Sequence, residues 1–503
     1  MPKYKYLIIG GGMTGDAAAK GIRKVDANGA IGMIGAEPHR PYDRPPLSKG
    51  LWKDTPQEKI WRRQPGGVDL HAGRKVQVID PVKKQVIDDQ GATYSYDKLL
   101  LATGGTPRRF SFGDGRIIYY RTFDDYQRLR KLADERRRFV VIGGGFIGSE
   151  IAAALAMNGK EVVLAFPGDG IGDRVFPRDL SQFLNGYYQK KGVEVLARES
   201  VAGCEARGDQ AAIKIRNRDS SAEREIVADG VVAGIGIEPN VELAQGAGLE
   251  VGNGILVNEF LQTSHREIFA AGDVAAFHSP LLGRRIRVEH EDNANNMGRA
   301  AGRAIAGQAE PYKHLPFFYS DLFDLGYEAV GEIVPRLEAV ADWKTPQQEG
   351  VVYYLRNGRV RGVLLWNVWG QVDAARSLIA EPGPFRREDL QGRLPKRGVT
   401  GHYFKGIAGN RFRVPVAGST VIPTDSSAVT PSNGSASSGP KITRPAVTSP
   451  MNPISTRPNG YSCMAPSAIS YVVVPAGFTP IFFKSEAGAS ESVAPVSTRN
   501  LDS

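Results

Sequence analysis

The sequence predicts an α/β protein with two doubly wound units, a smaller C-terminal domain and a tail. Three observations predict these parts in turn. The pattern strand, glycine-rich turn, helix, strand occurs twice, once at the N-terminus and once after residue 137. A two-residue turn between two apolar runs near residue 357 predicts an antiparallel hairpin. The composition then changes near residue 400. With 503 residues, the chain is too long for one ordinary core and is expected to form several domains.

The first unit begins with an apolar strand over residues 4–9, followed by a glycine-rich turn, an Ala-rich helix over 16–24 and a second strand over 30–34. The turn has the spacing G-x-G-x-x-G, and Glu37 follows the second strand about twenty residues further on. In this arrangement the glycines let a pyrophosphate approach the helix N-terminus, and the carboxylate accepts hydrogen bonds from a ribose. The unit therefore predicts a dinucleotide site. Its turn consists of Gly10, Gly11, Gly12, Met13, Thr14 and Gly15.

The second unit repeats this order, with strands over 138–142 and 161–164, a turn over 143–148 and a helix over 149–156. No carboxylate stands directly at the end of its second strand. Asp169 lies slightly late for a ribose, while Arg174 is placed to meet a 2′-phosphate, so NADH is favoured only slightly over NADPH. Two dinucleotide sites in one chain predict two cofactors that exchange electrons, as in a flavin reductase.

Composition and charge exclude several other classes. The net charge is +10, but the basic residues are scattered, so no specific nucleic-acid binding is predicted. No apolar run approaches the ~20 residues of a membrane span, and the N-terminal apolar run is too short for a secretory signal, so we expect a cytoplasmic protein. The two cysteines, Cys204 and Cys463, have no cysteine neighbours and the seven histidines are dispersed, so neither dithiol chemistry nor a metal site is predicted.

The last hundred residues differ from the rest. Residues 401–503 are rich in Ser, Pro, Thr and Gly, and we expect a disordered, low-complexity tail because such a segment buries too little apolar surface. An apolar island over 471–483 is interrupted by two prolines.

Four segments now indicate a family. Residues 40–49 (RPYDRPPLSK), 101–107 (LATGGTP), 268–274 (IFAAGDV) and 287–294 (RVEHEDNA) resemble FAD-dependent pyridine nucleotide oxidoreductases. Within that family the chain is similar to apoptosis-inducing-factor-like proteins, to ferredoxin reductases of oxygenases and to monodehydroascorbate reductases. The similarity runs in unbroken order from residue 3 to about residue 390.

The resemblance implies two Rossmann-like domains and a C-terminal α+β interface domain. The FAD-binding domain would comprise residues 1–119 and 242–314, with the NAD(P)H-binding domain, 120–241, inserted between them. Residues 315–400 would form the α+β domain and 401–503 the tail.

For FAD, the resemblance adds Arg44, Val76 at the adenine, Arg121 and Asp273 to the glycine turn and Glu37. The helix that begins near Glu291 would direct its positive end toward the flavin. Lys49 and Glu150 would form an ion pair beside the flavin and are the predicted catalytic residues. The alternative is a surface lysine and a glutamate that merely stabilises a helix N-terminus.

For the nicotinamide nucleotide, Phe146 would stack on or gate the flavin face. Tyr319 stands where apoptosis-inducing factors have a tryptophan. Gly168 replaces the carboxylate that those relatives use for the adenine ribose, which leaves Asp169 as the nearest substitute. The complete predicted set on this side is Gly144, Gly145, Phe146, Ile147, Asp169, Arg174, Gly236, Glu289, His290, Tyr319, Glu328 and Asn367.

The leading hypothesis is therefore an FAD-dependent NAD(P)H oxidoreductase without a redox-active disulfide. Its acceptor would be a small acidic ferredoxin, a quinone or a radical such as monodehydroascorbate. The alternative is a redox-gated binding or assembly protein of the apoptosis-inducing-factor type, with slow turnover. A polyanion-binding role rests on net charge alone, and a homodimer is left open.

Overall fold

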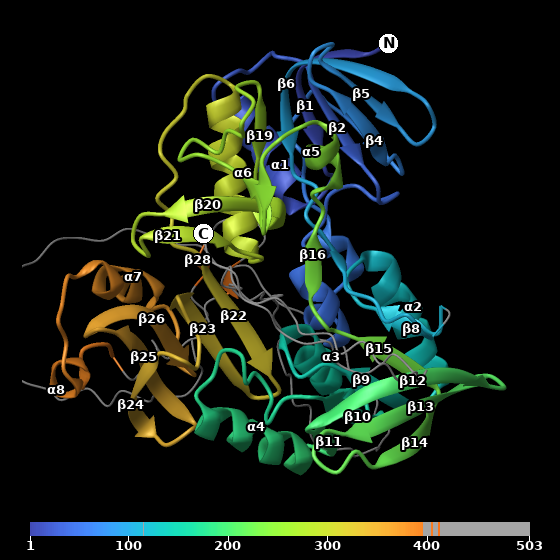
Figure 1. Cartoon of the computed structure of the whole chain (residues 1–503), viewed down its shortest axis with the longest axis vertical. Helices are drawn as coiled ribbons and strands as arrows, with labels where there is room; N and C mark the ends of the chain where they lie inside the picture. Colours follow the sequence, from blue (N-terminus) through green and yellow to red (C-terminus); the bar gives the residue numbers. More distant parts are fainter. Residues whose placement is uncertain (114, 396–403, 406–410, 413–503) are drawn as a thin grey trace, which may run out of the picture.

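The computed structural model describes residues 1–113, 115–395, 404–405 and 411–412 (Figure 1). The first sheet has the order β3-β2-β1-β6-β5-β4, with β19 beside β6. Strands β1, β2, β3, β6 and β19 run parallel, and β4 and β5 form an antiparallel extension. The strands are β1 (Lys3–Ile9), β2 (Ile31–Gly35), β3 (Val68–Ala72), β4 (Val76–Asp80), β5 (Gln85–Asp88), β6 (Thr93–Leu101) and β19 (Ile268–Ala270).

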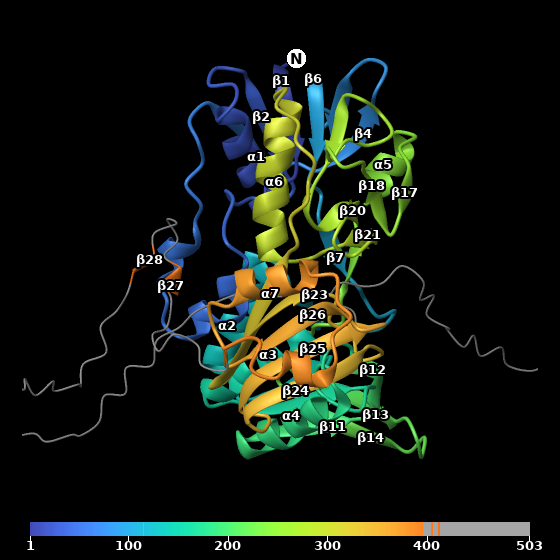
Figure 2. The same ribbon diagram turned by 90° about the vertical axis from the view of Figure 1, so that its left-hand side faces the viewer.

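Helices α1 (Met13–Arg23) and α6 (Glu291–Ile305) lie side by side on this sheet (Figure 2). Glycines allow the close approach: a Cβ on Gly21 would lie 2.4 Å from the carbonyl oxygen of Arg299, and one on Gly302 would lie 2.1 Å from that of Ala18. The two helices therefore pack backbone against backbone and form one rigid support for the loops at their N-termini.

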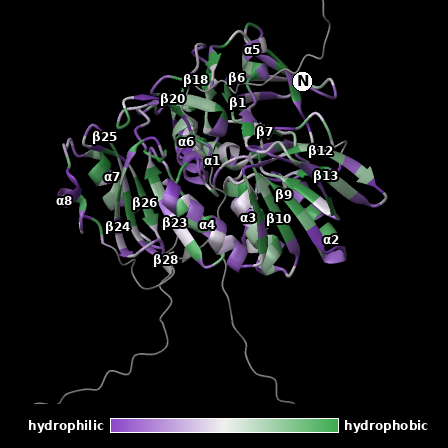
Figure 3. Cartoon of the chain, turned by 60° about the horizontal axis from the view of Figure 1, so that its bottom comes forward, coloured by the Kyte–Doolittle hydropathy of each residue, from purple (hydrophilic) through white to green (hydrophobic). Residues whose placement is uncertain are grey.

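The second sheet is fully parallel, with the order β11-β10-β9-β15-β8. Its strands are β8 (Ile117–Tyr119), β9 (Arg138–Ile142), β10 (Glu161–Phe166), β11 (Val193–Ala197) and β15 (Gly230–Ala233). Its helices are α2 (Phe123–Glu135), α3 (Phe146–Met157) and α4 (Arg178–Lys190). In Figure 3 hydrophobic colour follows β9 and β10 and hydrophilic colour marks α2, as expected for buried parallel strands under surface helices.

Smaller elements connect and cover these two sheets. An antiparallel pair, β7 (Gly105–Pro107) and β16 (Ile237–Pro239), joins the two units. A three-stranded sheet consists of β12 (Glu199–Arg207), β13 (Gln210–Asn217) and β14 (Glu223–Ala228). A four-stranded sheet consists of β17 (Val251–Gly252), β18 (Gly254–Leu256), β20 (Ala275–Ser279) and β21 (Arg284–Arg287), next to α5 (Glu242–Gly246). The short 3₁₀ turns are η1 (Pro45–Ser48), η2 (Gly50–Trp52), η3 (Gln57–Ile60) and η4 (Gly272–Val274).

The C-terminal part is an antiparallel five-stranded sheet with the order β22-β23-β26-β25-β24. Its elements are β22 (Phe317–Leu322), β23 (Leu325–Gly331), β24 (Glu338–Thr345), β25 (Glu349–Arg356), β26 (Arg359–Trp366), α7 (Val372–Ala380) and α8 (Arg387–Leu390). The predicted hairpin is confirmed: Asn357 and Gly358 join β25 to β26, both with positive φ, as a tight hairpin turn requires. The sheet lies against both parallel-sheet units (Figure 1).

The α/β fold class is confirmed, but several predicted boundaries shift. Helices predicted over 16–24 and 149–156 begin earlier, at Met13 and Phe146, because Gly12 and Gly145 are their N-caps and the helices start inside the glycine turns. The domain boundaries stay a prediction. The predicted tail, 401–503, lies outside the described residues except for the short pair β27 (Phe404–Lys405) and β28 (Arg411–Phe412). Over the described residues, no helix is long and apolar enough to cross a membrane.

Candidate functional site

The turn between β1 and α1 has one closed and one open side. Gly10 has a φ of +127°, and a Cβ there would lie 2.1 Å from the carbonyl oxygen of Ala102. A Cβ on Gly15 would lie 2.1 Å from the carbonyl oxygen of Gly10. At Gly12, the N-cap of α1, nothing lies within 4 Å of the added atom. The space at Gly12 and the free N–H groups of the helix N-terminus fit a pyrophosphate.

Glu37 lies just beyond β2, where its carboxylate is held from two directions. The Tyr42 hydroxyl donates to Oε2 at 2.6 Å, and the Arg44 guanidinium donates to Oε1. Arg44 also donates to the carbonyl oxygen of Arg121 at 2.9 Å. Burial opposes ionisation of Glu37, yet Arg44 and Tyr42, with Arg121, hold the pKa of its carboxyl below its usual value. Glu37 is therefore an anion that can accept hydrogen bonds from ribose hydroxyls.

A second charged network links the loop after β8 with η4 and β21. Arg121 contacts Asp273 at 3.0 Å, and Arg287 contacts Glu289 at 2.6 Å and the backbone oxygen of Asp273 at 2.9 Å. Burial raises the pKa of Glu289 to about 7, with Arg287 opposing the rise and Asp273 adding to it. Asp273, predicted for the FAD side, and Glu289, predicted for the nicotinamide side, thus share one network. Val76 is buried at the start of β4.

Lys49 and Glu150, the predicted catalytic pair, are brought together although 101 positions separate them. Lys49 Nζ lies 2.9 Å from Glu150 Oε1, and their side chains are only 2% and 0% exposed. The hydroxyls of Ser48 and Ser320 donate to the two carboxylate oxygens at 2.7 and 2.6 Å. Burial raises the pKa of Glu150, although Lys49 and both serines favour its charged form. The geometry excludes the surface alternative, since neither group faces solvent.

Aromatic rings surround this pair. Lys49 Nζ lies 5.8 Å from the centre of the Tyr319 ring, and the Tyr319 hydroxyl donates to Glu291 at 3.3 Å. Phe146 contacts Phe318 edge to face at 5.4 Å, and His290 stacks on Phe318 at 4.5 Å. Burial lowers the pKa of His290 to about 3, so the imidazole is neutral at physiological pH. The Lys49–Glu150 ion pair is therefore buried beside a cluster of aromatic rings.

The turn between β9 and α3 repeats the geometry of the first turn. Gly143 has a φ of +114°, and a Cβ on Gly148 would lie 1.8 Å from the carbonyl oxygen of Gly143. At Gly145, the N-cap of α3, nothing lies within 4 Å of an added Cβ. Gly144 packs on the Phe166 ring and Ile147 is buried. This turn therefore fits a second pyrophosphate at Gly145.

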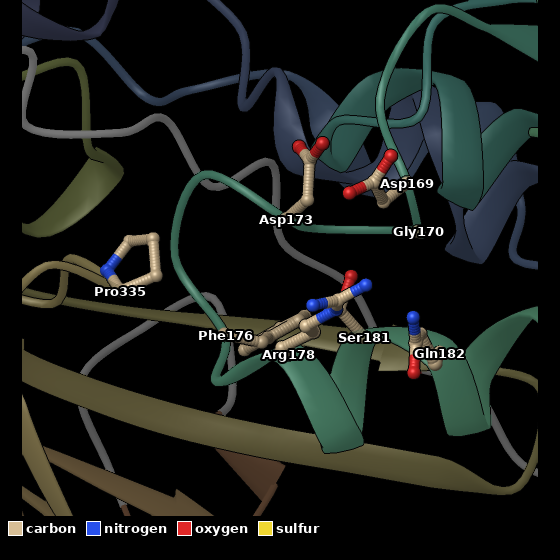
Figure 4. Close-up of a pocket in the computed structure, with 8 residues that line it drawn as sticks. All are labelled: Asp169, Gly170, Asp173, Phe176, Arg178, Ser181, Gln182 and Pro335. Atoms are coloured by element: carbon tan, nitrogen blue, oxygen red, sulfur yellow. The ribbon is translucent and has the colours of Figure 1, made fainter. Parts of the chain in front are cut away.

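The end of β10 differs from the end of β2. Arg218 donates to Asp169 at 3.1 Å, and Arg198 lies 3.7 Å from it. Arg174 is exposed. A cavity of about 240 Å³ opens beside Asp169 (Figure 4). It is lined by Asp169, Gly170, Asp173, Phe176, Arg178, Ser181, Gln182 and Pro335.

Three further residues that were predicted for the nicotinamide nucleotide lie in a loop, on β23 and just after β26. Gly236, with a φ of +93°, follows β15. Glu328 on β23 accepts a hydrogen bond from the backbone of Gly370, and Asn367 joins Gly326 to Gln348. Asn367 thus links β23 to the residue before β25, and the roles of all three residues toward a nucleotide stay predictions.

Sequence reasoning missed four residues of these sites: Ser48 and Ser320, which donate to Glu150, Tyr42, which donates to Glu37, and Asp173, which lines the cavity beside Asp169. Ser48 and Tyr42 belong to the segment that carried the family resemblance, so their position beside Lys49 and Arg44 was a usable signal. Ser320 and Asp173 reach their places through the packing of the C-terminal sheet and a folded-back loop, which spacing does not reveal.

Comparison with known proteins agrees with this geometry. The model of the pyridine nucleotide-disulphide oxidoreductase family matches residues 4–298. The chain belongs to this family. A second model, for the C-terminal part of mitochondrion-associated apoptosis-inducing factor, matches residues 344–381.

Relatives of this pyridine nucleotide oxidoreductase include both enzymes and apoptosis-inducing factors. The 5,5'-dehydrodivanillate O-demethylase ferredoxin reductase subunit of Sphingobium is 35% identical over 373 residues, covering 72% of this chain and 89% of that protein. A mitochondrial protein of the apoptosis-inducing factor 1 type from Drosophila melanogaster is 31% identical over 476 residues. That match covers 75% of this chain but only 64% of the fly protein, less than two thirds of its length.

Among solved structures, the covalent complex of putidaredoxin reductase with putidaredoxin contains a chain that superposes with a TM-score of 0.70. The two chains are 32% identical, and the match covers 76% of this chain and 94% of that chain.

The oxidoreductase uses FAD and NAD(P)H, as its family does. Despite the family name, it offers no cysteine pair in the part of the chain that the structure describes, where Cys204 is buried and unpaired. The same residues hold no cluster suited to a metal ion. The open sides at Gly12 and Gly145 fit the two dinucleotides. The cytoplasmic location and the homodimer stay predictions.

Proposed function

We propose that this oxidoreductase is a ferredoxin reductase, which takes a hydride from NADH and passes electrons to a small acidic iron–sulfur protein. One observation carries the choice of acceptor. A cavity of about 320 Å³ at the C-terminal ends of α1 and α6 has five lysines or arginines among its seven lining residues. The lining residues are Lys20, Gly21, Arg23, Lys24, Pro65, Arg299 and Arg303.

The first glycine turn and its network would hold FAD. In this proposal Gly12 and the N-terminus of α1 bind the pyrophosphate, Glu37 binds the adenosine ribose, and Arg121 with Asp273 positions the phosphate or ribityl portion. FAD supplies the carrier that accepts two electrons as a hydride and releases electrons singly.

The Lys49–Glu150 pair would lie at the meeting point of the two nucleotides. The pair combines a residue from the flavin unit with one from the first turn of α3, so it fixes both units in one arrangement. The Lys49 ammonium stabilises negative charge that develops nearby, and the rings of Phe146 and Tyr319 keep water away. Neutral His290 moves no proton at pH 7, and hydride transfer needs none from it.

The cationic cavity supports an acidic protein partner rather than a small neutral acceptor. Lys20 is paired with Asp16, and Arg23 is bound by backbone carbonyls, but Lys24 is exposed and Arg303 partly so. The cations lie toward the C-terminal ends of α1 and α6, and the proposed FAD site lies at the opposite, N-terminal ends of the same two helices. Complementary charge speeds encounter and fixes orientation, which electron transfer between proteins requires. The ferredoxin reductase subunit and the putidaredoxin complex among the relatives support this choice.

The test is an anaerobic titration of the purified holoenzyme with NADH and with NADPH, followed by an oxidised acidic [2Fe–2S] ferredoxin or a benzoquinone. We expect the flavin absorbance to bleach and ferredoxin to restore it over many turnovers. Lys24→Glu should raise the KM for ferredoxin about three- to tenfold at low salt and less at high salt. Lys131→Glu, an equal charge change on the exposed face of α2, is the control and should leave that KM unchanged.

Turnover with the quinone alone, insensitive to Lys24→Glu, would refute the ferredoxin proposal. The match of residues 344–381 to the apoptosis-inducing factor model favours a second candidate, a redox-gated binding protein. A long-wavelength charge-transfer band that neither acceptor discharges would support that function instead.

A further inference from the structure

The end of β10 lacks the side chain that the corresponding strand end of the flavin unit provides. By the family resemblance, Gly168 stands where apoptosis-inducing-factor-like proteins would carry a ribose-binding carboxylate. A Cβ built on Gly168 would lie 1.9 Å from Oδ2 and 2.7 Å from Cγ of Asp173. The Asp173 carboxylate therefore occupies the space into which a side chain at position 168 would project.

A folded-back loop brings Asp173 to this place. The backbone N–H of Gly172 donates to the carbonyl oxygen of Gly144 at 2.8 Å, which ties the loop to the second glycine turn. The N–H of Asp173 donates to the carbonyl oxygen of Gly170, which closes a tight turn. A carboxylate five residues later in the chain is thus returned to the strand end and held beside the turn.

Asp169, the nearest carboxylate in the sequence, is already engaged. Its Oδ1 accepts a hydrogen bond from Arg218, and Arg198 lies nearby. In Figure 4 the carboxylates of Asp169 and Asp173 lie on the same side of the loop, at the cavity of about 240 Å³. Burial raises the pKa of Asp173, while Arg174, a hydrogen bond from the Asp169 backbone and Arg218 oppose the rise, and the charge of the Asp169 carboxylate adds to it. A partly desolvated carboxylate gains more from new hydroxyl donors than a hydrated one does.

We propose that Asp173 is the carboxylate that binds the 2′- and 3′-hydroxyls of the adenosine ribose of NADH, so that the enzyme selects NADH over NADPH. This inference rests on the proposed function, because it concerns the same nucleotide site. A carboxylate accepts hydrogen bonds from both hydroxyls, whereas the 2′-phosphate of NADPH places like charge against it. The exposed guanidinium of Arg174 would instead favour the 2′-phosphate of NADPH, so the measured coenzyme preference tests the role of Asp173 directly.

The experiment measures the dissociation constants of NAD⁺ and NADP⁺ by calorimetry on the FAD-loaded protein, which requires no turnover. Wild type should bind NAD⁺ more tightly. Asp173→Asn should weaken NAD⁺ binding about tenfold and leave NADP⁺ binding unchanged or tighter. Asp179→Asn, the same change at an exposed position in the first turn of α4, is the control and should alter neither constant.

A second experiment moves the carboxylate from position 173 to position 168. Gly168→Glu alone should weaken NAD⁺ binding, because its side chain meets Asp173, whereas Gly168→Glu with Asp173→Gly should restore the preference for NAD⁺. A ratio of the two constants that stays within twofold in Asp173→Asn, or a wild-type preference for NADP⁺, would overturn the inference. If NADH reduces the flavin of wild type but Asp173→Asn leaves the ratio of the two dissociation constants unchanged, only the role of Asp173 is refuted. If neither nucleotide binds or reduces the flavin, the proposed function falls with it.

Discussion

The two glycine turns of this molecule have nearly the same geometry but are completed in different ways. In each, the first glycine has a positive φ, the third is closed off by the carbonyl oxygen of the first, and the middle one opens onto empty space at a helix N-terminus. The first unit adds Glu37 directly after its second strand, held by Arg44 and Tyr42. The second unit has Gly168 near the equivalent place, filled by Asp173 from a later turn.

The difference shows which part of such a site is fixed by backbone geometry and which is not. The first and last glycines of each turn are required because main-chain atoms leave no room for a Cβ, whereas the middle glycine leaves space for the pyrophosphate, so the spacing is the same in both units. The ribose-binding carboxylate needs only to reach a point in space, and any loop that returns there can provide it. Spacing in the sequence therefore predicts the phosphate site better than it predicts the ribose site.

We expect the largest effects on ligand binding at Gly12 and Gly145, the two positions at which the turns are most alike. A Cβ fits both positions, because φ is negative and no atom lies within 4 Å of it, so we expect the fold to survive a valine there while its methyl groups displace the pyrophosphate. We expect Gly12→Val to purify nearly without FAD. Gly145→Val should retain FAD but bind NAD⁺ about 100-fold more weakly. Flavin absorbance per protein and calorimetry measure the two effects.

Gly186→Val is the control for these variants, since Gly186 on α4 is equally open but belongs to neither turn. It should retain both ligands. Loss of FAD from Gly145→Val would mean that the two turns do not act separately, and the comparison would fail.

A smaller effect tests the contact that joins the two units. Lys49→Ala leaves the buried Glu150 carboxylate without its cation, so we expect the free energy of unfolding to fall by about 3–5 kcal/mol. The rate of flavin reduction by NADH should fall more than the FAD content does. Urea unfolding and stopped-flow absorbance measure the two effects.

The double variant Lys49→Ala with Glu150→Gln removes the uncompensated charge and should recover part of the stability but not the rate. Equal loss of FAD content and rate in Lys49→Ala would show that Lys49 stabilises the FAD site rather than the reacting region. Full recovery of the rate in the double variant would show that the pair is only structural.

The contrast between the two units also shows which features of the fold and the site can be predicted from the sequence. Both glycine turns, the hairpin at Asn357 and Gly358, and the α/β class followed from local patterns. The approach of Lys49 to Glu150 followed only from the family resemblance, because no local pattern connects positions so far apart. Ser320 and Asp173 could not be predicted, since each depends on a tertiary contact: the C-terminal sheet in one case and the hydrogen bond from Gly172 to Gly144 in the other.

The smallest expected effect concerns Glu289, which is buried in the charged network with Arg287 and Asp273. Its pKa rises from an ordinary 4.5 to about 7, so between these values the folded protein binds a proton that the unfolded chain has released. Stability from this group is therefore present below pH 4.5 and is lost as the pH rises to about 7. We expect the free energy of unfolding of Glu289→Gln to rise by roughly 1–3 kcal/mol relative to that of wild type between pH 4.5 and pH 8.

The measurement is urea unfolding of both holoproteins at several pH values, and the difference between them isolates Glu289. Buried His290 has the opposite sign, because its lowered pKa makes stability rise with pH, but its contribution is common to both proteins and cancels in the difference. Glu338→Gln, an exposed change on β24, should give a constant difference and serves as control. A constant difference for Glu289→Gln as well would mean that Arg287 keeps this carboxylate charged throughout, and that the network is a simple pair of ion pairs.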